Sequence, residues 1–171
     1  MDNKRVGETI LKDLSSFMIG FERDLEGLAC LINRNAGSSI NTTNQISNYV
    51  EAKAERVCLH VEKEVFIGIE RSGVRKTGRK YVQRARIDYM LTFFDGAKLA
   101  IEIDQKNKAW SLKKLAHCVS DDDCFGMWIR WKGEMQKVFR QNTSKICMVD
   151  ITTIFPEIST IGKKWMEGGT T

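Results

Sequence analysis

Four residues that could do chemistry together fall on what the sequence predicts to be one β-hairpin. Asp88 lies on the first strand, and Glu102, Asp104 and Lys106 alternate with other residues in the run IEIDQK. Side chains two residues apart on a strand share one face of a sheet, so the last three should project together. Two neighbouring carboxylates repel each other and lose hydration, a cost that a bound cation removes. The pattern therefore predicts a metal site.

The turn between the two strands decides whether Asp88 joins this site. The strand ARIDYMLTFF passes through Asp95-Gly96 into KLAIEID. A three-residue loop of residues 94–96 would place Asp88 opposite Glu102 on the same face, and a loop of 95–97 would place it opposite Asp104, again on that face. A two-residue Asp95-Gly96 turn would point Asp88 the other way. The hypothesis therefore requires one of the longer loops.

The predicted site favours phosphoryl chemistry. Carboxylates are hard oxygen ligands, which suit Mg²⁺ or Mn²⁺. Such an ion would lower the pKa of a bound water and stabilise charge on a phosphate, and Lys106 could orient that water or neutralise the transition state.

A basic segment precedes the site and predicts a nucleic-acid partner. Residues 71–87 contain seven basic side chains and no acidic one, whereas the whole chain has a net charge of +5. We expect these residues, with one lysine after the site, to bind the backbone of DNA. They are Arg71, Arg75, Lys76, Arg79, Lys80, Arg84, Arg86 and Lys108.

The hydrophobic spacing predicts the elements that position the hairpin. Residues three and four apart form the apolar stripe of a first helix, at Ile10, Leu14, Phe17, Phe21, Leu25, Leu28 and Ile32. After polar residues 33–44, a second helix should begin at Thr42, Thr43 or Asn44 and run to about residue 64, burying Ile46, Val50, Ala54, Val57 and Val61. Extended segments are expected at 65–76, 80–94, 98–106, 125–131 and 145–154, and further helices at 111–118 and 132–141. This order predicts an α/β fold with a mixed sheet between helices.

Length and composition fit one compact domain. The chain has 171 residues, 42% of them hydrophobic, and one proline. We expect residues 1–42 to be a helical extension packed on an α/β domain of residues 43–171. No run is apolar enough for a membrane span or a signal peptide, and five scattered cysteines without a CxxC pair favour reduced thiols, so we expect a cytoplasmic protein. Zinc at His117, Cys118 and Cys124 is disfavoured, because the group lacks a second close pair of ligands. Lysines 113 and 114 should be solvated.

The hairpin resembles one nuclease family. Asp88, followed after a β-turn by Glu102-Ile103-Asp104-Gln105-Lys106, is similar to the signature of the PD-(D/E)XK nuclease superfamily, and the likeness covers roughly residues 45–131. It implies a restriction endonuclease-like fold with an αβββαβ core. It also implies that Asp88 and either Glu102 or Asp104 bind metal, and that Glu51 or Glu55 matches a helix glutamate found in some members.

Two departures from the signature leave its details open. Ile87 stands where the signature has proline, and Asp104 stands where a Glu-x-Lys motif would have lysine. Either Asp104-Gln105-Lys106 is the functional motif, or Glu102 is the acid with an acidic partner.

The function expected from these features is that of a Mg²⁺- or Mn²⁺-dependent deoxyribonuclease, an endonuclease that hydrolyses phosphodiester bonds. The alternative is a catalytically inactive module on the same fold, an inhibitor or assembly subunit that binds nucleic acid or protein. The first helix could pack on its own domain, pair with a second copy in a homodimer, or bind another protein.

Overall fold

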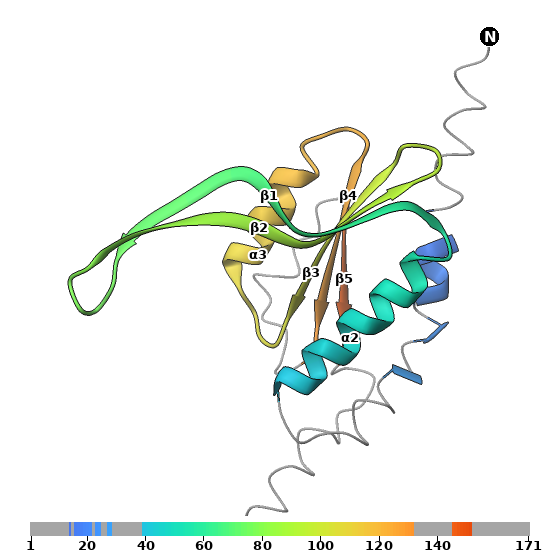
Figure 1. Cartoon of the computed structure of the whole chain (residues 1–171), viewed down its shortest axis with the longest axis horizontal. Coiled ribbons are helices and arrows are strands. Elements are labelled where there is room, and N and C mark those ends of the chain that lie inside the picture. Colours follow the sequence, from blue (N-terminus) through green and yellow to red (C-terminus); the bar gives the residue numbers. More distant parts are fainter. Residues whose placement is uncertain are drawn as a thin grey trace, which may run out of the picture.

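The computed structural model describes residues 39–131 and 145–151, together with residues 14, 16–21, 23, 24, 27 and 28. The chain folds into α/β architecture, with a five-stranded mixed sheet flanked by helices (Figure 1). The described residues between 14 and 28 are helical. The elements that follow are α2 (Ser39–Ala54), β1 (Cys58–Val74), β2 (Lys80–Phe93), β3 (Lys98–Asp104), α3 (Ala109–Cys118), β4 (Cys124–Arg130) and β5 (Ile146–Asp150).

The sheet combines an antiparallel half and a parallel half. Its strand order is β1-β2-β3-β4-β5, so every strand pairs with its neighbour in sequence. β1, β2 and β3 form an antiparallel meander, whereas β3, β4 and β5 run parallel. Helix α3 makes the crossover that a parallel connection from β3 to β4 requires. The predicted meander, crossover helix and mixed sheet are confirmed.

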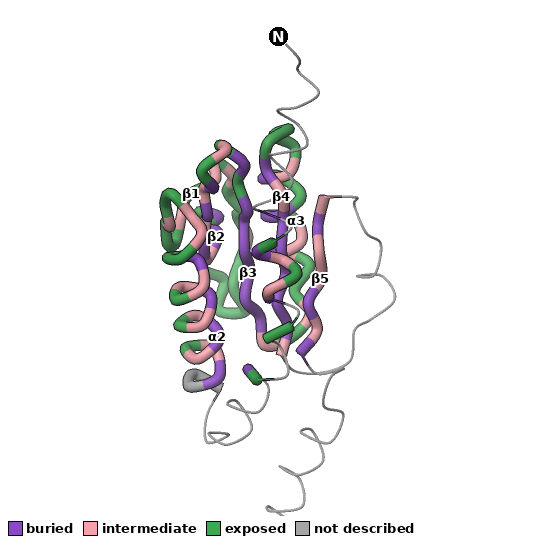
Figure 2. The backbone as a smooth tube through the Cα atoms, turned by 90° about the vertical axis from the view of Figure 1, so that its right-hand side faces the viewer, coloured by how far each residue is buried: buried purple, intermediate pink, exposed green. Residues whose placement is uncertain are grey.

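Apolar side chains cover both faces of the sheet. On one face, the strands pack with α2 and the helical residues before it, and Phe17, Phe21, Ile46 and Val50 are fully buried there. On the other face, Leu115 and Cys118 of α3 pack with Trp128 of β4. Figure 2 shows that buried residues concentrate in the central strands. The described members of the first predicted stripe therefore pack within the chain itself.

Helix α2 is shorter than predicted at its C-terminus. We expected a helix to about residue 64, but α2 ends at Ala54 and β1 begins at Cys58. Val57 and Val61 are half-buried instead of lying on a helix face. Pairing of residues 58–66 with β2 gives these β-branched and apolar residues a sheet partner, which overrides a weak helical pattern. The helix also begins earlier than expected, at Ser39.

The C-terminal elements are described in part. The predicted strand 145–154 is observed as Ile146–Asp150. The predicted helix 132–141 lies outside the described residues.

Strands β1 and β2 continue beyond the body of the protein as a two-stranded arm, which we define as residues 66–86 (Figure 1). The strands pair from Phe66 and Arg86 out to Val74 and Lys80, with a register shift between Phe66 and Glu70. A turn closes the tip, where the Gly78 N–H donates to the Arg75 carbonyl oxygen at 2.8 Å. Gly78 has a φ of +77°, which favours glycine.

The described part of the chain contains no helix that is long and apolar enough to cross a membrane.

Candidate active site

The loop that decides the orientation of Asp88 has three residues. The Phe93 N–H donates to the Ala97 carbonyl oxygen at 2.9 Å, which leaves residues 94–96 as the loop. Gly96 supplies the left-handed conformation that such a loop needs, with a φ of +89°. The paired ladder ends at Tyr89 and Ile101, and Asp88 and Glu102 are the next residues on the two strands, where both line one pocket. The first of the two predicted longer loops is therefore confirmed, and Asp88 faces the same side as Glu102.

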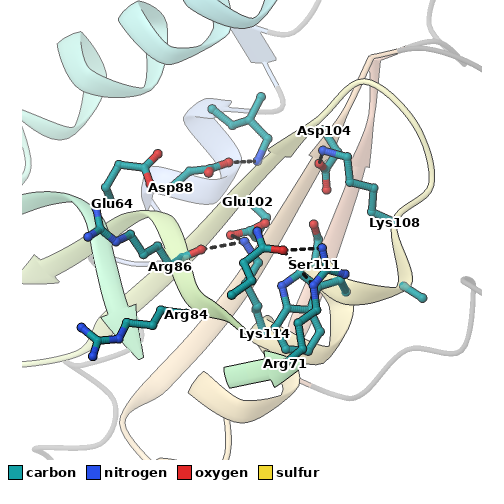
Figure 3. A pocket seen from close by; sticks show the side chains of 14 residues that line it. Glu64, Arg71, Arg84, Arg86, Asp88, Glu102, Asp104, Lys108, Ser111 and Lys114 are labelled. Atoms are coloured by element: carbon teal, nitrogen blue, oxygen red, sulfur yellow. Dashed lines mark hydrogen bonds and ion pairs between the residues drawn. The ribbon is translucent and has the colours of Figure 1, made fainter. Parts of the chain in front are cut away.

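A pocket of about 660 Å³ brings the predicted carboxylates together. Asp88, Glu102 and Asp104 all line it, on the sheet face that α3 covers. Figure 3 shows these side chains entering the pocket from β2 and β3, with α3 on the opposite wall. The other lining residues are Glu64, Arg71, Gln83, Arg84, Arg86, Ile103, Lys108, Ala109, Trp110, Ser111 and Lys114.

Asp88 is fixed by the backbone of the neighbouring strand. Its Oδ2 accepts a hydrogen bond from the Ile103 N–H at 2.7 Å (Figure 3). Burial raises the pKa of the Asp88 carboxyl, and repulsion from Asp104 and Glu64 adds to this effect. The hydrogen bond and the charge of Lys114 oppose it. Asp88 is thus a positioned carboxylate in a region crowded with negative charge.

Glu102 is the most strongly perturbed acid of the pocket. Its side chain is 2% exposed, and its Oε1 lies 2.5 Å from the Lys114 ammonium. Burial, followed by repulsion from Asp88, raises the pKa of Glu102 to about 7, although the bonds from Lys114 and Ser111 act in the opposite direction. Lys114 also donates to the Arg86 carbonyl oxygen at 2.6 Å, which fixes the ammonium between β2 and β3.

Both oxygens of Asp104 are occupied by neighbouring side chains. The Trp128 indole N–H donates to Oδ2 at 2.8 Å, and the Lys108 ammonium lies 2.5 Å from Oδ1. Trp128 is fully buried in β4, directly beside Glu102 in the sheet. Asp104 is therefore held by its own surroundings. Asp88 is repelled by Asp104 and Glu64, and it in turn repels Glu102.

Three predicted residues lie elsewhere. The expectation that Lys106 continues the strand is wrong, because β3 ends at Asp104 and Lys106 is exposed outside the pocket lining. Glu51 binds the Tyr89 hydroxyl and the Lys63 ammonium, both at 2.6 Å. Tyr89 belongs to the core on the α2 side, so Glu51 lies across the sheet from Asp88. Glu55 is exposed after the last residue of α2.

Lys114 and Glu64 are pocket residues that sequence reasoning did not select. The expectation that Lys114 is solvated is wrong, because Lys114 is only 8% exposed. It could have been found from its spacing, because Ser111, Leu115 and Cys118 form the buried stripe of α3 and Lys114 lies within it. Glu64 on β1 has a φ of +53°, a strained conformation for a residue with a side chain, and no sequence pattern indicates it.

The predicted nucleic-acid contacts divide into two groups. Arg71, Arg84, Arg86 and Lys108 line the pocket. The other four are exposed at the tip of the arm: Arg75, Lys76, Arg79 and Lys80. Arg71 lies over the Trp110 ring at 4.9 Å and donates two hydrogen bonds to Gln83, so the base of the arm is joined to the start of α3.

Within the residues that the structure describes, no group of three or more His, Cys, Asp or Glu side chains is arranged to hold a metal ion. The pocket instead offers two repelling carboxylates, Asp88 and Glu102, together with two lysines already bound to acids. Comparisons with protein-family models, curated proteins and solved structures give no match to this chain.

Proposed function

We propose that the chain is a divalent-cation-dependent nuclease that hydrolyses phosphodiester bonds in DNA, built on a restriction endonuclease-like fold. The observation that carries this proposal is that Asp88 and Glu102, on the neighbouring strands β2 and β3, face one pocket whose rim continues into a basic arm. The element order from α2 to β4, helix, three antiparallel strands, helix and parallel strand, supports the proposed fold because it is the αβββαβ order of that family.

The donor set fits a hard divalent cation held by two carboxylates. Mg²⁺ commonly binds one or two protein carboxylates and completes its shell with water and substrate phosphate, so a third protein ligand is not required. The repulsion between Asp88 and Glu102 is the kind of cost that a cation removes. When bound, Mg²⁺ or Mn²⁺ would supply an activated water and charge stabilisation at the phosphate.

The remaining pocket residues have separable roles in this proposal. Lys114 brings a buried positive charge to Glu102 and is suited to stabilise negative charge on the scissile phosphate. Asp104 is a positioning residue, because Trp128 and Lys108 hold both of its oxygens. Arg84 and Arg86 lie at the rim, where they can bind the flanking phosphates.

One observation favours the alternative, an inactive nuclease-like module that binds nucleic acid or protein. Lys108 and Lys114 each lie 2.5 Å from a buried carboxylate, so the pocket partly neutralises its own charge. In an active enzyme, a cation must bind Glu102 while Lys114 stays or moves aside. In an inactive module, the two ion pairs simply keep the pocket closed to metal.

Cleavage of single-stranded, duplex and branched DNA with Mg²⁺ or Mn²⁺ tests the proposal. Wild type should cleave at least one substrate, and Asp88→Asn and Glu102→Gln should each lose activity by about 100-fold or more. The asparagine oxygen can still accept the Ile103 N–H, so Asp88→Asn should remain folded. Glu55→Gln is the matched control, because this glutamate is exposed away from the pocket. Binding of DNA by wild type without cleavage of any substrate would establish the inactive module instead.

A further inference from the structure

The arm concentrates the positive charge of the molecule. Residues 66–86 contain seven basic residues and Glu70 as their single acid, so the formal charge of the arm is +6, against +5 for the whole chain. Among described residues, Glu70 pairs with Arg84 at the base of the arm. The four basic residues at the tip form no ion pair within the described part of the chain. This surface is complementary to a polyanion.

One face of the arm is hollowed from the pocket toward the tip. A second hollow of about 440 Å³ is lined by Arg71, Arg75, Tyr81, Val82 and Gln83. It shares Arg71 and Gln83 with the pocket that contains the carboxylates. A bound chain of phosphates could therefore run from the pocket past Arg71 to Arg75 along one basic surface.

The aromatic rings along this path are engaged by cations. Arg75 lies 5.9 Å from the Tyr81 ring, and Arg71 lies 4.9 Å from the Trp110 ring. Proteins that bind single strands use open aromatic faces as platforms for bases. Here the rings hold arginines in place, which favours contacts to phosphates over stacking on unpaired bases.

From these observations we propose that the arm is a second DNA-binding site, which binds duplex on one side of the pocket and sets the length of duplex required on that side. The identity of the ligand rests on the proposed function. A two-stranded ribbon fits the width of the major groove. Six residues separate Arg86 at the pocket from Lys80 at the tip, which is about 20 Å of strand. That distance corresponds to about six base pairs.

Binding to duplexes of increasing length tests this proposal without cleavage. Fluorescence anisotropy with the full chain in EDTA would compare wild type with the tip variant Arg75→Ala/Lys76→Ala/Arg79→Ala. The control is Arg23→Ala/Arg56→Ala/Lys98→Ala, which removes three exposed basic residues outside the arm and the pocket and leaves the same net charge. A single strand of the same sequence is a second probe.

The proposal predicts three results. Wild-type affinity should rise with duplex length until the arm is covered, and the tip variant should reach its plateau about six base pairs earlier. The tip variant should lower the slope of log affinity against log salt by about 2 to 3, whereas the control should change it by less than 1. The single strand should bind more weakly than the duplex.

Equal losses in the tip variant and the control would overturn the proposal, because the arm would then act through net charge alone. Equal or tighter binding of the single strand would overturn it as well. Absence of cleavage beside the expected binding pattern would contradict the proposed nuclease activity and leave the arm site supported.

Discussion

Lys114 contacts a carboxylate of the pocket from helix α3, whereas Lys106 is exposed and does not line the pocket. This difference gives the first prediction. Lys114→Met should lower the rate of metal-dependent DNA cleavage by about 100-fold, because it removes a buried charge beside Glu102. Lys106→Met should cost at least tenfold less, because this side chain is exposed after β3. Single-turnover cleavage rates check this, and equal losses would show that the lysine after the strand acts as the sequence motif suggests.

The raised pKa of Glu102 predicts how the free energy of unfolding depends on pH. Its pKa of about 7 in the folded protein exceeds the value of about 4.3 in an unfolded chain, so the folded state holds its proton more tightly. This contribution to stability is present below about pH 4 and is lost as the pH rises through 7, on the order of 4 kcal/mol in all. In Glu102→Gln, which stays neutral, this loss should be absent.

Urea unfolding in EDTA between pH 4.5 and 7.5 measures the effect. The free energy of unfolding of Glu102→Gln should exceed that of wild type increasingly toward pH 7, and the two should converge toward pH 4.5. Glu55→Gln, at an exposed position, should follow the wild-type profile. Parallel profiles for wild type and Glu102→Gln would show that Glu102 is not perturbed as proposed.

At the scale of elements, the turn at Gly96 sets the register that brings Asp88 to the pocket. Its φ of +89° is strained for any residue with a side chain, so Gly96→Ala should lower the free energy of unfolding by about 1 kcal/mol or more. Gly27→Ala offers a control of the opposite sign. Gly27 is helical with open space where a Cβ would lie, so alanine should raise stability by about 0.5 to 1 kcal/mol. Urea unfolding measures both variants, and a stabilising effect of Gly96→Ala would contradict a left-handed conformation at Gly96.

The hairpin could be predicted from the sequence because its determinants are local. The alternation of side chains along a strand puts Glu102 and Asp104 on one face. The Asp95-Gly96 pair restricts the hairpin to a few turn types. The boundary between α2 and β1 could not be predicted in the same way. Residues 58–64 become strand because β2 lies beside them, and that pairing joins positions as far apart as Cys58 and Phe93.

The side chains that bind Glu102 and Asp104 also come from elements distant in the sequence. Lys114 reaches Glu102 because α3 packs over the sheet, and Trp128 reaches Asp104 because β4 pairs beside β3. The local sequence motif therefore predicts Lys106 as the lysine of the site. In the folded protein, the lysine that contacts Glu102 is Lys114, twelve residues later in the chain.

For the whole molecule, a cation that binds the folded state and not the unfolded state should raise the free energy of unfolding. Wild type with Mn²⁺ at about 100 times its dissociation constant should gain about 2.7 kcal/mol, which raises the thermal midpoint by about 5 to 10 °C. Asp88→Asn removes one proposed ligand and should lose most of this shift. Differential scanning fluorimetry with Mn²⁺ and Mg²⁺ measures both proteins, and equal shifts in the two would place the metal away from Asp88.

Among the strands that the structure describes, the long strand β1 forms an edge of the sheet, since β2 is its one neighbour in the strand order. An unpaired edge of seventeen residues is a template for adding another strand, and such edges lead to aggregation unless something interrupts them. Here a positive φ at Glu64, another at Gly68 and a register shift before Glu70 break the edge into short pieces. We therefore expect the irregular backbone of β1 to disfavour the addition of a second chain to this edge of the sheet.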